Sequence, residues 1–333
     1  MKSKAFILRS RPDGEPQKEN FEIQNLELGE PKRKQLLIET VCFTVDPYMR
    51  GRMNKSKSYA ASFEIGKPLD GGVVGKVLKS EHPNFKEGDL VASESGGWRT
   101  HALVEGDQCR RVDTDNFEPS DYLGAAGMPG ITAYAGLFYV GRPVAGETVM
   151  VSAASGAVGS LVCQFAKLSG CRVIGSAGSD KKVTYLKDKL GVEAAFNYKK
   201  VDSVDKAFAD HAPDGIDIYW DNVGGEFLQA ALSHMNVRGR IASCGMISTY
   251  NEKTLSPGPS NLVQVIGKRL RMEGFLSFDH FDKYPEYLSK LARWKKSGLV
   301  SWETTRVKGF ESGADAFLGL FSGENLGKMV VEV

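Results

Sequence analysis

The sequence predicts an α/β protein with two domains, one β-rich and one built on a doubly wound parallel sheet. Its 333 residues exceed what one hydrophobic core usually supports, since single cores stop growing at about 250–300 residues. The first part of the chain consists of short apolar runs separated by turns, which is typical of β-structure. From residue 148 onward, strand-like and helix-like segments alternate, which indicates βαβ units and a parallel sheet.

The N-terminal part is expected to hold several strands and no long helix. Apolar and β-branched runs predict strands at residues 5–8, 35–41, 71–78, 86–92 (a turn that leads into a strand) and 98–104. Ser120 is expected to cap a helix that runs into Leu123, before the glycine-rich residues 124–130.

The second part is expected to hold six parallel strands. Strands are predicted at residues 148–152, 171–176, 194–198, 215–221, 240–245 and 270–276, and helices at 156–168, 181–190, 226–235 and 284–296. Gly170 and Gly191 directly follow two of these helices, as glycines at the C′ position do. Six strands complete a doubly wound sheet, after which residues 328–333 return to a β pattern.

Composition excludes several classes of protein. The net charge is only +2, so no basic excess favours nucleic acid as a partner. No run approaches the roughly 20 apolar residues of a membrane span, and the N-terminal apolar run is too short for a signal peptide. We therefore expect a cytoplasmic protein that binds no membrane. The five cysteines form no C-x-x-C pair, which argues against a disulfide framework and a zinc site.

The strongest chemical signal lies between the first strand and first helix of the alternating region. Residues 153–159 read Ala-Ala-Ser-Gly-Ala-Val-Gly, a variant of the G-x-G-x-x-G nucleotide fingerprint. Gly156 would let the backbone approach a pyrophosphate, and Gly159 would let helix and strand pack closely. The N–H groups at the helix start, near Ala157 and Val158, would face the phosphates.

The end of the second strand favours NADPH over NADH. Enzymes that bind NAD usually place Asp or Glu there to hold the ribose 2′-hydroxyl, whereas residues 176–179 here are Ser-Ala-Gly-Ser. Asp180 comes late, at the expected start of the next helix, and Lys181 and Lys182 follow it. Small residues and lysines suit a 2′-phosphate better than a hydroxyl.

Six segments, taken together and in order, resemble one branch of a known family. They are residues 45–53, 128–134, 156–160, 221–225, 248–251 and 323–328. The chain resembles the zinc-free prostaglandin reductase and leukotriene dehydrogenase branch of the medium-chain dehydrogenase/reductase superfamily. Curcumin-type reductases and plant alkenal double-bond reductases belong to the same branch.

The resemblance implies a split architecture and an activity. Residues 1–124 and 299–333 would form a GroES-like β-barrel substrate domain, and residues 125–298 a Rossmann NADP-binding domain. The expected enzyme is an NADP-dependent oxidoreductase that reduces the C=C bond of a small hydrophobic enone or enal. A homodimer is expected, and the apolar residues 270–276 could pair across it or be buried within one subunit.

The resemblance also assigns residues to the cofactor. Gly156, Ala157, Val158 and Gly159 would meet the pyrophosphate, Lys182 and Tyr198 the 2′-phosphate, and Asn222, Cys244, Gly245, Met246, Ile247, Tyr250, Phe275, Leu276, Ser277 and Asn325 the remainder.

The zinc ligands of the alcohol dehydrogenases in this superfamily have no counterpart here. Cys42 lies near the position of their first ligand, but Gly71 and Gly72 stand where their Gly-His-Glu motif would be. All five histidines are isolated in the sequence. We therefore expect no metal.

Without a metal, hydrogen-bond donors must stabilise the enolate oxygen, and tyrosine suits this role because it donates while neutral. Three candidates are Tyr250, just past the fifth strand, Tyr59, in the polar loop 55–59, and Tyr48. Arg50 and Arg52 are expected to form structural ion pairs, with contact to an acidic substrate tail or to the cofactor as the alternative.

Two alternative functions remain open at this stage. They are a quinone reductase of the zeta-crystallin type and a nucleotide-binding protein without turnover. Residues 46–50 and 323–328 favour the double-bond reductases over the quinone reductases.

Overall fold

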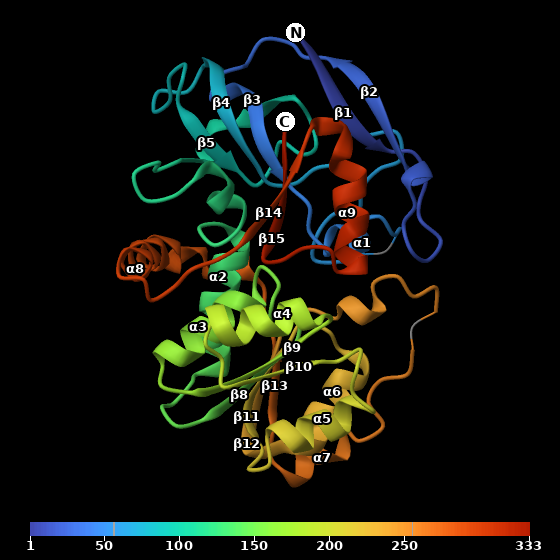
Figure 1. The fold of residues 1–333 in the computed structure, drawn as a ribbon. Coiled ribbons are helices and arrows are strands. Elements are labelled where there is room, and N and C mark those ends of the chain that lie inside the picture. Colours follow the sequence, from blue (N-terminus) through green and yellow to red (C-terminus); the bar gives the residue numbers. More distant parts are fainter. Residues whose placement is uncertain (56, 255) are drawn as a thin grey trace. The chain divides into compact units, whose positions relative to one another are not determined.

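A computed structural model gives the arrangement of residues 1–55, 57–254 and 256–333. The chain divides into two compact units (Figure 1). The first consists of Met1–Gly124 and Thr304–Val333, and the second of Ala125–Glu303. The chain therefore leaves the first unit once and returns to it near its end.

The first unit is rich in β-structure, as its sequence predicts, and its strands pair antiparallel except for β14 and β15, which are parallel. Within the described residues, β14, β15, β3, β4, β5 and β7 lie side by side in that order, β6 pairs with β3, and β1 pairs with β2. The strands are β1 (Lys2–Leu8), β2 (Phe21–Glu27), β3 (Gln35–Thr44), β4 (Val73–Ser80), β5 (Leu90–Ser93), β6 (His101–Glu105), β7 (Cys109–Arg111), β14 (Thr304–Lys308) and β15 (Lys328–Glu332). Strand β2 escaped prediction because most of its side chains are polar and exposed.

The helices of the first unit differ from the sequence-based prediction. They are α1 (Met49–Arg52) and α9 (Gly313–Ser322), and α9 was not predicted. The helix expected to begin at Ser120 is instead a short 3₁₀ turn, Pro119–Leu123, with Glu118 at its N-cap. The prediction for Ser120 is wrong because Pro119, which lacks an N–H, suits the first helical position better.

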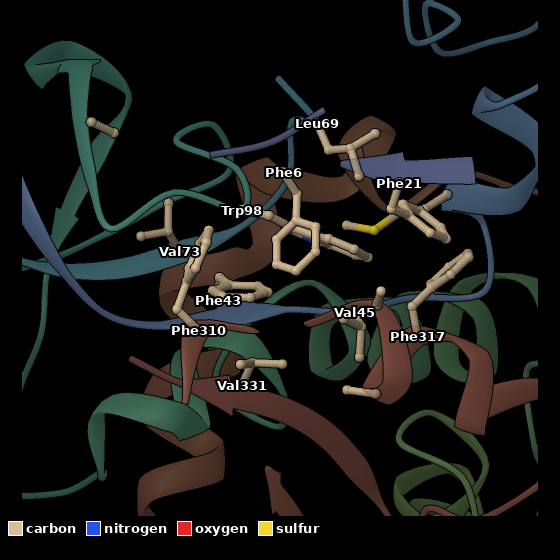
Figure 2. Close-up of a cluster of buried hydrophobic side chains, with 14 of the residues drawn as sticks. Phe6, Phe21, Phe43, Val45, Leu69, Val73, Trp98, Phe310, Phe317 and Val331 are labelled. Carbon is tan, nitrogen blue, oxygen red and sulfur yellow. The ribbon is translucent and has the colours of Figure 1, made fainter. Parts of the chain in front are cut away.

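An aromatic cluster fills the core of the first unit (Figure 2). The indole of Trp98 is fully buried, with the rings of Phe6, Phe43 and Phe317 at centroid distances of 5.6, 5.7 and 5.7 Å. Its Nε1 donates a 2.9 Å hydrogen bond to the carbonyl of Thr44. Because Phe317 belongs to α9, the core of this unit needs the C-terminal segment.

A buried ion pair joins the returning strand to the N-terminal sheet. Lys328, in β15, donates from Nζ to the carbonyl of Val45 (2.7 Å) and to Oδ1 of Asp46 (2.8 Å). The other carboxylate oxygen of Asp46 accepts from the hydroxyl of Thr44. Both charged side chains are at least nine-tenths buried, so each balances the charge of the other in a place that water cannot reach.

The second unit confirms the predicted doubly wound sheet. Within the described residues, six parallel strands lie in the order β10, β9, β8, β11, β12, β13, the strand order of dinucleotide-binding folds. They are β8 (Thr148–Val151), β9 (Arg172–Ala177), β10 (Ala194–Asn197), β11 (Ile216–Asp221), β12 (Met235–Ser243) and β13 (Arg271–Gly274). Strand β13 is shorter than expected and lies at the sheet edge, with Met272 39% exposed.

Helices cover both faces of this sheet, α3 and α4 on one and α5 and α6 on the other (Figure 1). The helices are α2 (Met128–Ala135), α3 (Gly159–Leu168), α4 (Asp180–Thr184), α5 (Val204–His211), α6 (Gly225–His234), α7 (Val263–Gly267) and α8 (Tyr284–Lys296). Helix α3 begins three residues later than predicted because the chain is still in a turn at Gly156, whose N–H bonds to the carbonyl of Ala153. Helix α5 was missed, although Ser203 caps it by accepting from the N–H of Lys206.

Helix length bears on membrane insertion. Helix α8 has 13 residues, whereas a bilayer core requires about 20. Across the described ranges, no helix is both long and apolar enough to cross a membrane.

Replacing Lys328 tests how far the first unit depends on the buried pair. Lys328→Met should lower the free energy of unfolding by about 3–5 kcal/mol, because Asp46 would remain buried without its cation. Lys4→Met, which breaks the exposed Lys4–Glu311 pair, should cost less than about 1 kcal/mol. Urea denaturation followed by circular dichroism measures both, and equal losses would contradict the assignment.

Candidate functional site

The carboxyl edge of the parallel sheet begins with the turn after β8. Ala153 has a positive φ of 47°, and the N–H of Ala154 bonds to the carbonyl of Ser176 in β9 at 2.9 Å. The turn is thereby fixed to the neighbouring strand. The first turn of α3, where the positive end of the helix dipole lies, follows directly.

The two glycines of this turn stand in different surroundings. A Cβ atom on Gly159 would lie 2.5 Å from the carbonyl oxygen of Ala153 and 2.9 Å from Cα of Ala154. Only glycine allows the helix to approach the turn this closely. On Gly156 the nearest atom to a Cβ would be the Ala153 oxygen, at 3.3 Å, so packing within the chain constrains that position much less.

At the end of β9 a tyrosine lies near a glycine, and a lysine follows in the first turn of α4. The ring of Tyr198 lies over Gly178, where a Cβ would come within 3.1 Å of the tyrosine hydroxyl. Ser179 caps α4 by accepting from the N–H of Lys182. The Lys182 side chain is half-buried, and burial together with the charge of Lys199 lowers its pKa.

Asp180 binds side chains of the segment that begins at β10. Its carboxylate accepts hydrogen bonds from Nδ2 of Asn197 (2.8 Å) and Nζ of Lys200 (2.5 Å). These bonds lower the pKa of Asp180. Asp180, the acid that follows β9, therefore already bonds to Asn197 in β10 and to Lys200 just beyond it.

Asn222, just after β11, links the ends of two neighbouring strands. Its Nδ2 donates to the carbonyl of Ser152 (2.7 Å), and its Oδ1 accepts from the indole N–H of Trp220 (3.1 Å). The hydroxyl of Ser152 accepts from the backbone N–H of Asn222 (2.9 Å). The amide is thus held by the protein itself.

The loop after β12 carries Cys244, Gly245, Met246, Ile247 and Tyr250. The hydroxyl of Tyr250 accepts a long 3.4 Å hydrogen bond from the N–H of Met246 and lies over Gly245, where a Cβ would come within 3.1 Å. Burial, and then the charge of Asp221, raises the pKa of the Cys244 thiol to about 12. At neutral pH this thiol is therefore protonated and a poor nucleophile.

Phe275, Leu276 and Ser277 follow β13 directly. The ring of Phe275 packs against Trp220 with centroids 5.6 Å apart. Both rings press on Gly136, where a Cβ would lie 2.2 Å from Phe275 and 2.4 Å from Trp220. Trp220 is therefore in contact with both Asn222 and Phe275.

The remaining expected residues lie in the first unit. Tyr48 precedes α1 and packs against the aromatic core, and burial, followed by the charge of Asp46, raises its pKa. Tyr59 is 59% exposed, and Ser56 of its loop lies outside the described residues. Asn325 donates from Nδ2 to the carbonyl of Gly327 at 2.8 Å.

Arginines hold the segment between Tyr48 and Tyr59. Arg50 is buried and donates to the carbonyl of Gly14 and to Oδ1 of Asn54. Arg52 donates to the carbonyl of Ala61. Both arginines therefore hold the chain through hydrogen bonds to carbonyl and amide oxygens, where ion pairs were expected.

The side chains do not fit a zinc site. No three His, Cys, Asp or Glu side chains in the described ranges gather closely enough to hold a metal ion. Cys42 is buried in β3, which raises its thiol pKa to about 12, and zinc binds the thiolate. Gly71 faces Met49, whose Cε would be 2.5 Å from an added Cβ.

Sequence reasoning missed three residues that organise this edge. Trp220, Asp221 and Ser152 place Asn222 and the loops around it. A signal was present, since Asp221 follows the apolar residues 218–220 at the end of a buried strand. The sequence alone shows no partner for it.

Comparison with known proteins shows extensive similarity. Residues 4–112 match the family described as the N-terminal domain of oxidoreductase, and residues 157–293 match that described as zinc-binding dehydrogenase. The chain is 47% identical to the NADP(+)-dependent 2-alkenal reductase of Nicotiana tabacum, over 99% of this chain and 97% of that protein. It is 42% identical to prostaglandin reductase 1 of Bos taurus, over 99% of both chains.

A solved structure agrees closely in fold. CurA from Vibrio vulnificus in complex with NADPH superposes with a TM-score of 0.94 at 39% identity, over 99% of both chains. The similarity therefore extends over both units of the chain.

Proposed function

The chain belongs to the alkenal, prostaglandin and curcumin reductase branch of the medium-chain dehydrogenase/reductase superfamily, and on this premise we propose that it reduces the C=C bond of α,β-unsaturated aldehydes and ketones with NADPH. It is an oxidoreductase of this class. The substrate is proposed to be a small hydrophobic enal or enone. High identity over the whole chain to a 2-alkenal reductase supports this substrate class.

The observation that carries the choice of cofactor is the group of side chains at the end of β9. A 2′-phosphate needs cations and hydroxyl donors. Tyr198 and Ser179 supply hydroxyls beside Gly178, and Lys182, in the first turn of α4, supplies a cation. The lowered pKa of Lys182 reflects burial and a neighbouring positive charge, both of which an anion would offset. Asp180, the acid that could hold a 2′-hydroxyl instead, is bonded to Asn197 and Lys200.

Most of the other proposed cofactor residues follow the carboxyl ends of the same sheet, and Asn325 belongs to the first unit. Gly156, Ala157, Val158 and Gly159 would hold the pyrophosphate at the start of α3. The remaining contacts are proposed for Asn222, Cys244, Gly245, Met246, Ile247, Tyr250, Phe275, Leu276, Ser277 and Asn325. NADPH, when bound, supplies the hydride that reaches the β-carbon of the substrate.

The protein must then stabilise negative charge on the substrate's carbonyl oxygen and deliver a proton to the α-carbon. A hydroxyl donor in a dry site serves the first task, each donor contributing roughly 3 kcal/mol. We propose Tyr250, Tyr59 and Tyr48 as candidates for these roles. The raised pKa of Tyr48 keeps its hydroxyl protonated, and therefore able to donate.

The reaction is tested with purified protein, NADPH and a panel of enals, enones and quinones. We expect NADPH oxidation with the enals and enones, and a product in which the carbonyl is retained and the C=C bond is saturated. Loss of nicotinamide absorbance measures the rate, and mass spectrometry and NMR identify the product. Turnover of quinones alone would instead indicate a quinone reductase, and NADPH binding without any turnover would indicate a non-catalytic protein.

Replacing Lys182 tests the cofactor preference. Lys182→Ala should raise the KM for NADPH by about 10- to 100-fold, because a charge-assisted contact contributes roughly 1.5–3 kcal/mol, and should leave the KM for NADH unchanged. Lys181→Ala is the matched control, since Lys181 is the exposed neighbour on the same helix. If both variants behave alike, the 2′-phosphate lies elsewhere.

Replacing each tyrosine by phenylalanine separates the candidate donors. Tyr250→Phe should lower kcat by about 100-fold if its hydroxyl stabilises the enolate, with little change in the KM for NADPH. Tyr59→Phe and Tyr48→Phe are compared in the same assay. Tyr139→Phe is the control, since Tyr139 stacks on His280 and is not among the proposed site residues. Unchanged kcat in all three candidate variants would rule out a tyrosine donor.

We also propose a homodimer formed through β13. This strand pairs with β12 on one side, and within the described residues no strand covers its other side; such an edge is a template for pairing with another chain. Exposed apolar residues adjoin it in α7, with Val263 and Ile266 67% and 78% exposed. Light scattering should give twice the chain mass. Ile266→Glu should yield a monomer, whereas Val144→Glu, at an exposed apolar position outside β13 and α7, should leave the dimer intact. A monomeric parent would refute the proposal.

A further inference from the structure

The carboxylate of Asp221 is buried at the point where β11 ends. Its side chain is fully excluded from solvent. One oxygen, Oδ1, accepts three hydrogen bonds: from the N–H of Val223 (3.0 Å), the N–H of Gly224 (2.8 Å) and the hydroxyl of Tyr219 (3.0 Å). The carboxylate therefore fixes the start of the loop between β11 and α6.

The same residue holds the next loop through its backbone. The carbonyl oxygen of Asp221 accepts from the N–H groups of Cys244 (2.9 Å) and Gly245 (3.0 Å). The two loops are joined again farther along, where Ser248 donates from its hydroxyl to the carbonyl of Val223 at 2.5 Å. A shift of the first loop would therefore displace the second.

Both loops carry residues proposed to contact NADPH. The first holds Asn222 and the second runs from Cys244 to Tyr250. In parallel α/β sheets the ligand lies outside the carboxyl ends of the strands. The position of Asp221 therefore bears on two parts of the proposed cofactor site at once.

Burial and hydrogen bonding act on the pKa of the Asp221 carboxyl in opposite directions. Burial raises the pKa of Asp221, and the bonds from Gly224, Val223 and Tyr219 oppose that rise. The second oxygen, Oδ2, is buried and has no hydrogen-bond partner among the described residues. Among the described residues, the three bonds at Oδ1 therefore hold the carboxylate in place.

A second aspartate at the opposite end of β11 provides an internal comparison. Asp217 accepts from the N–H of Thr148 in β8 (2.8 Å) and from Nδ2 of Asn236 in β12 (2.9 Å). It links β11 to β8 and β12 at the amino ends of these strands, whereas Asp221 holds loops at the carboxyl ends of β11 and β12. Any role that Asp221 has beyond fastening the sheet should be missing at Asp217.

We infer that Asp221 is a positioning residue for the cofactor, which sets the two loops at the carboxyl ends of β11 and β12 in their binding geometry. It acts through the backbone of residues 222–225 and 244–250. The inference rests on the proposed function, since it assumes NADPH as the ligand. It assigns Asp221 no contact with the cofactor.

The experiment compares Asp221→Asn with Asp217→Asn. Asparagine has the same shape, and its oxygen still accepts from the two N–H groups, but without the charge that strengthens such bonds. For Asp221→Asn we expect the Kd for NADPH, measured by nicotinamide fluorescence, to rise about tenfold. Hydrogen–deuterium exchange in residues 222–225 and 244–250 should accelerate by about tenfold as well.

The control should separate a positioning role from a stabilising one. Asp217→Asn should lower the melting temperature, yet leave the Kd for NADPH within about twofold of the parent. Equal weakening of NADPH binding in both variants would overturn the inference. So would faster exchange in Asp221→Asn with an unchanged Kd, because the carboxylate would then be structural only.

Two further outcomes are covered. If Asp221→Asn does not fold, Ser248→Ala removes the side-chain bond between the loops, while the backbone bonds from Ile247 and Ser248 remain. This variant should raise the Kd for NADPH in the same direction, and an unchanged Kd there overturns the inference. If the parent protein binds no NADPH, the proposed function fails as well. Parent NADPH binding without enone turnover refutes only the proposed reaction, because the Kd comparison still decides the role of Asp221.

Discussion

Six strands that run in one direction place all their carboxyl ends, and the loops that follow them, on one edge of the second unit. Each such loop leads toward a helix or a turn whose N–H groups face the same edge. The glycines after β8, the lysine after β9 and the loops after β11 and β12 come together for this reason alone. The order of the strands in the sheet, rather than distance along the sequence, therefore determines which loops lie next to each other at that edge.

The first unit depends on a different constraint, the return of the chain after residue 303. Strand β15 pairs with β3, and Phe317 of α9 completes the packing around Trp98. Lys328 then neutralises Asp46 between them. The turn that carries Tyr48 directly follows Asp46, so the position of this tyrosine depends on residues from both ends of the chain.

Much of this arrangement was predictable from sequence, and the exceptions have identifiable causes. Buried parallel strands such as β8 and β9 are rich in apolar and β-branched residues, and the glycine pattern of residues 156–159 marks the turn between β8 and α3. Strand β2 and helix α9 escaped because the first lacks apolar alternation and the second is almost uniformly apolar. The partners of Asp221 and Asn222 could not be foreseen, since nothing in the local sequence indicates that Ser152 or Cys244 will lie beside them.

Burial shifts the pKa values of titratable groups in the two units in opposite directions, and each direction suits the proposed chemistry. It raises the pKa of Tyr48 in the first unit and of the Cys244 thiol in the second, and lowers that of Lys182. Each shift favours the neutral form, because low-dielectric surroundings disfavour charge. A protonated thiol and a protonated phenol are poor nucleophiles but useful hydrogen-bond donors. Hydride transfer from a bound cofactor needs no nucleophile from the protein, whereas it does need donors that hold their protons until negative charge develops on the substrate. The lysine differs from the other groups in that an anion placed beside it would restore its charge, so the same desolvation that keeps the donors neutral makes the end of β9 a favourable place for a phosphate.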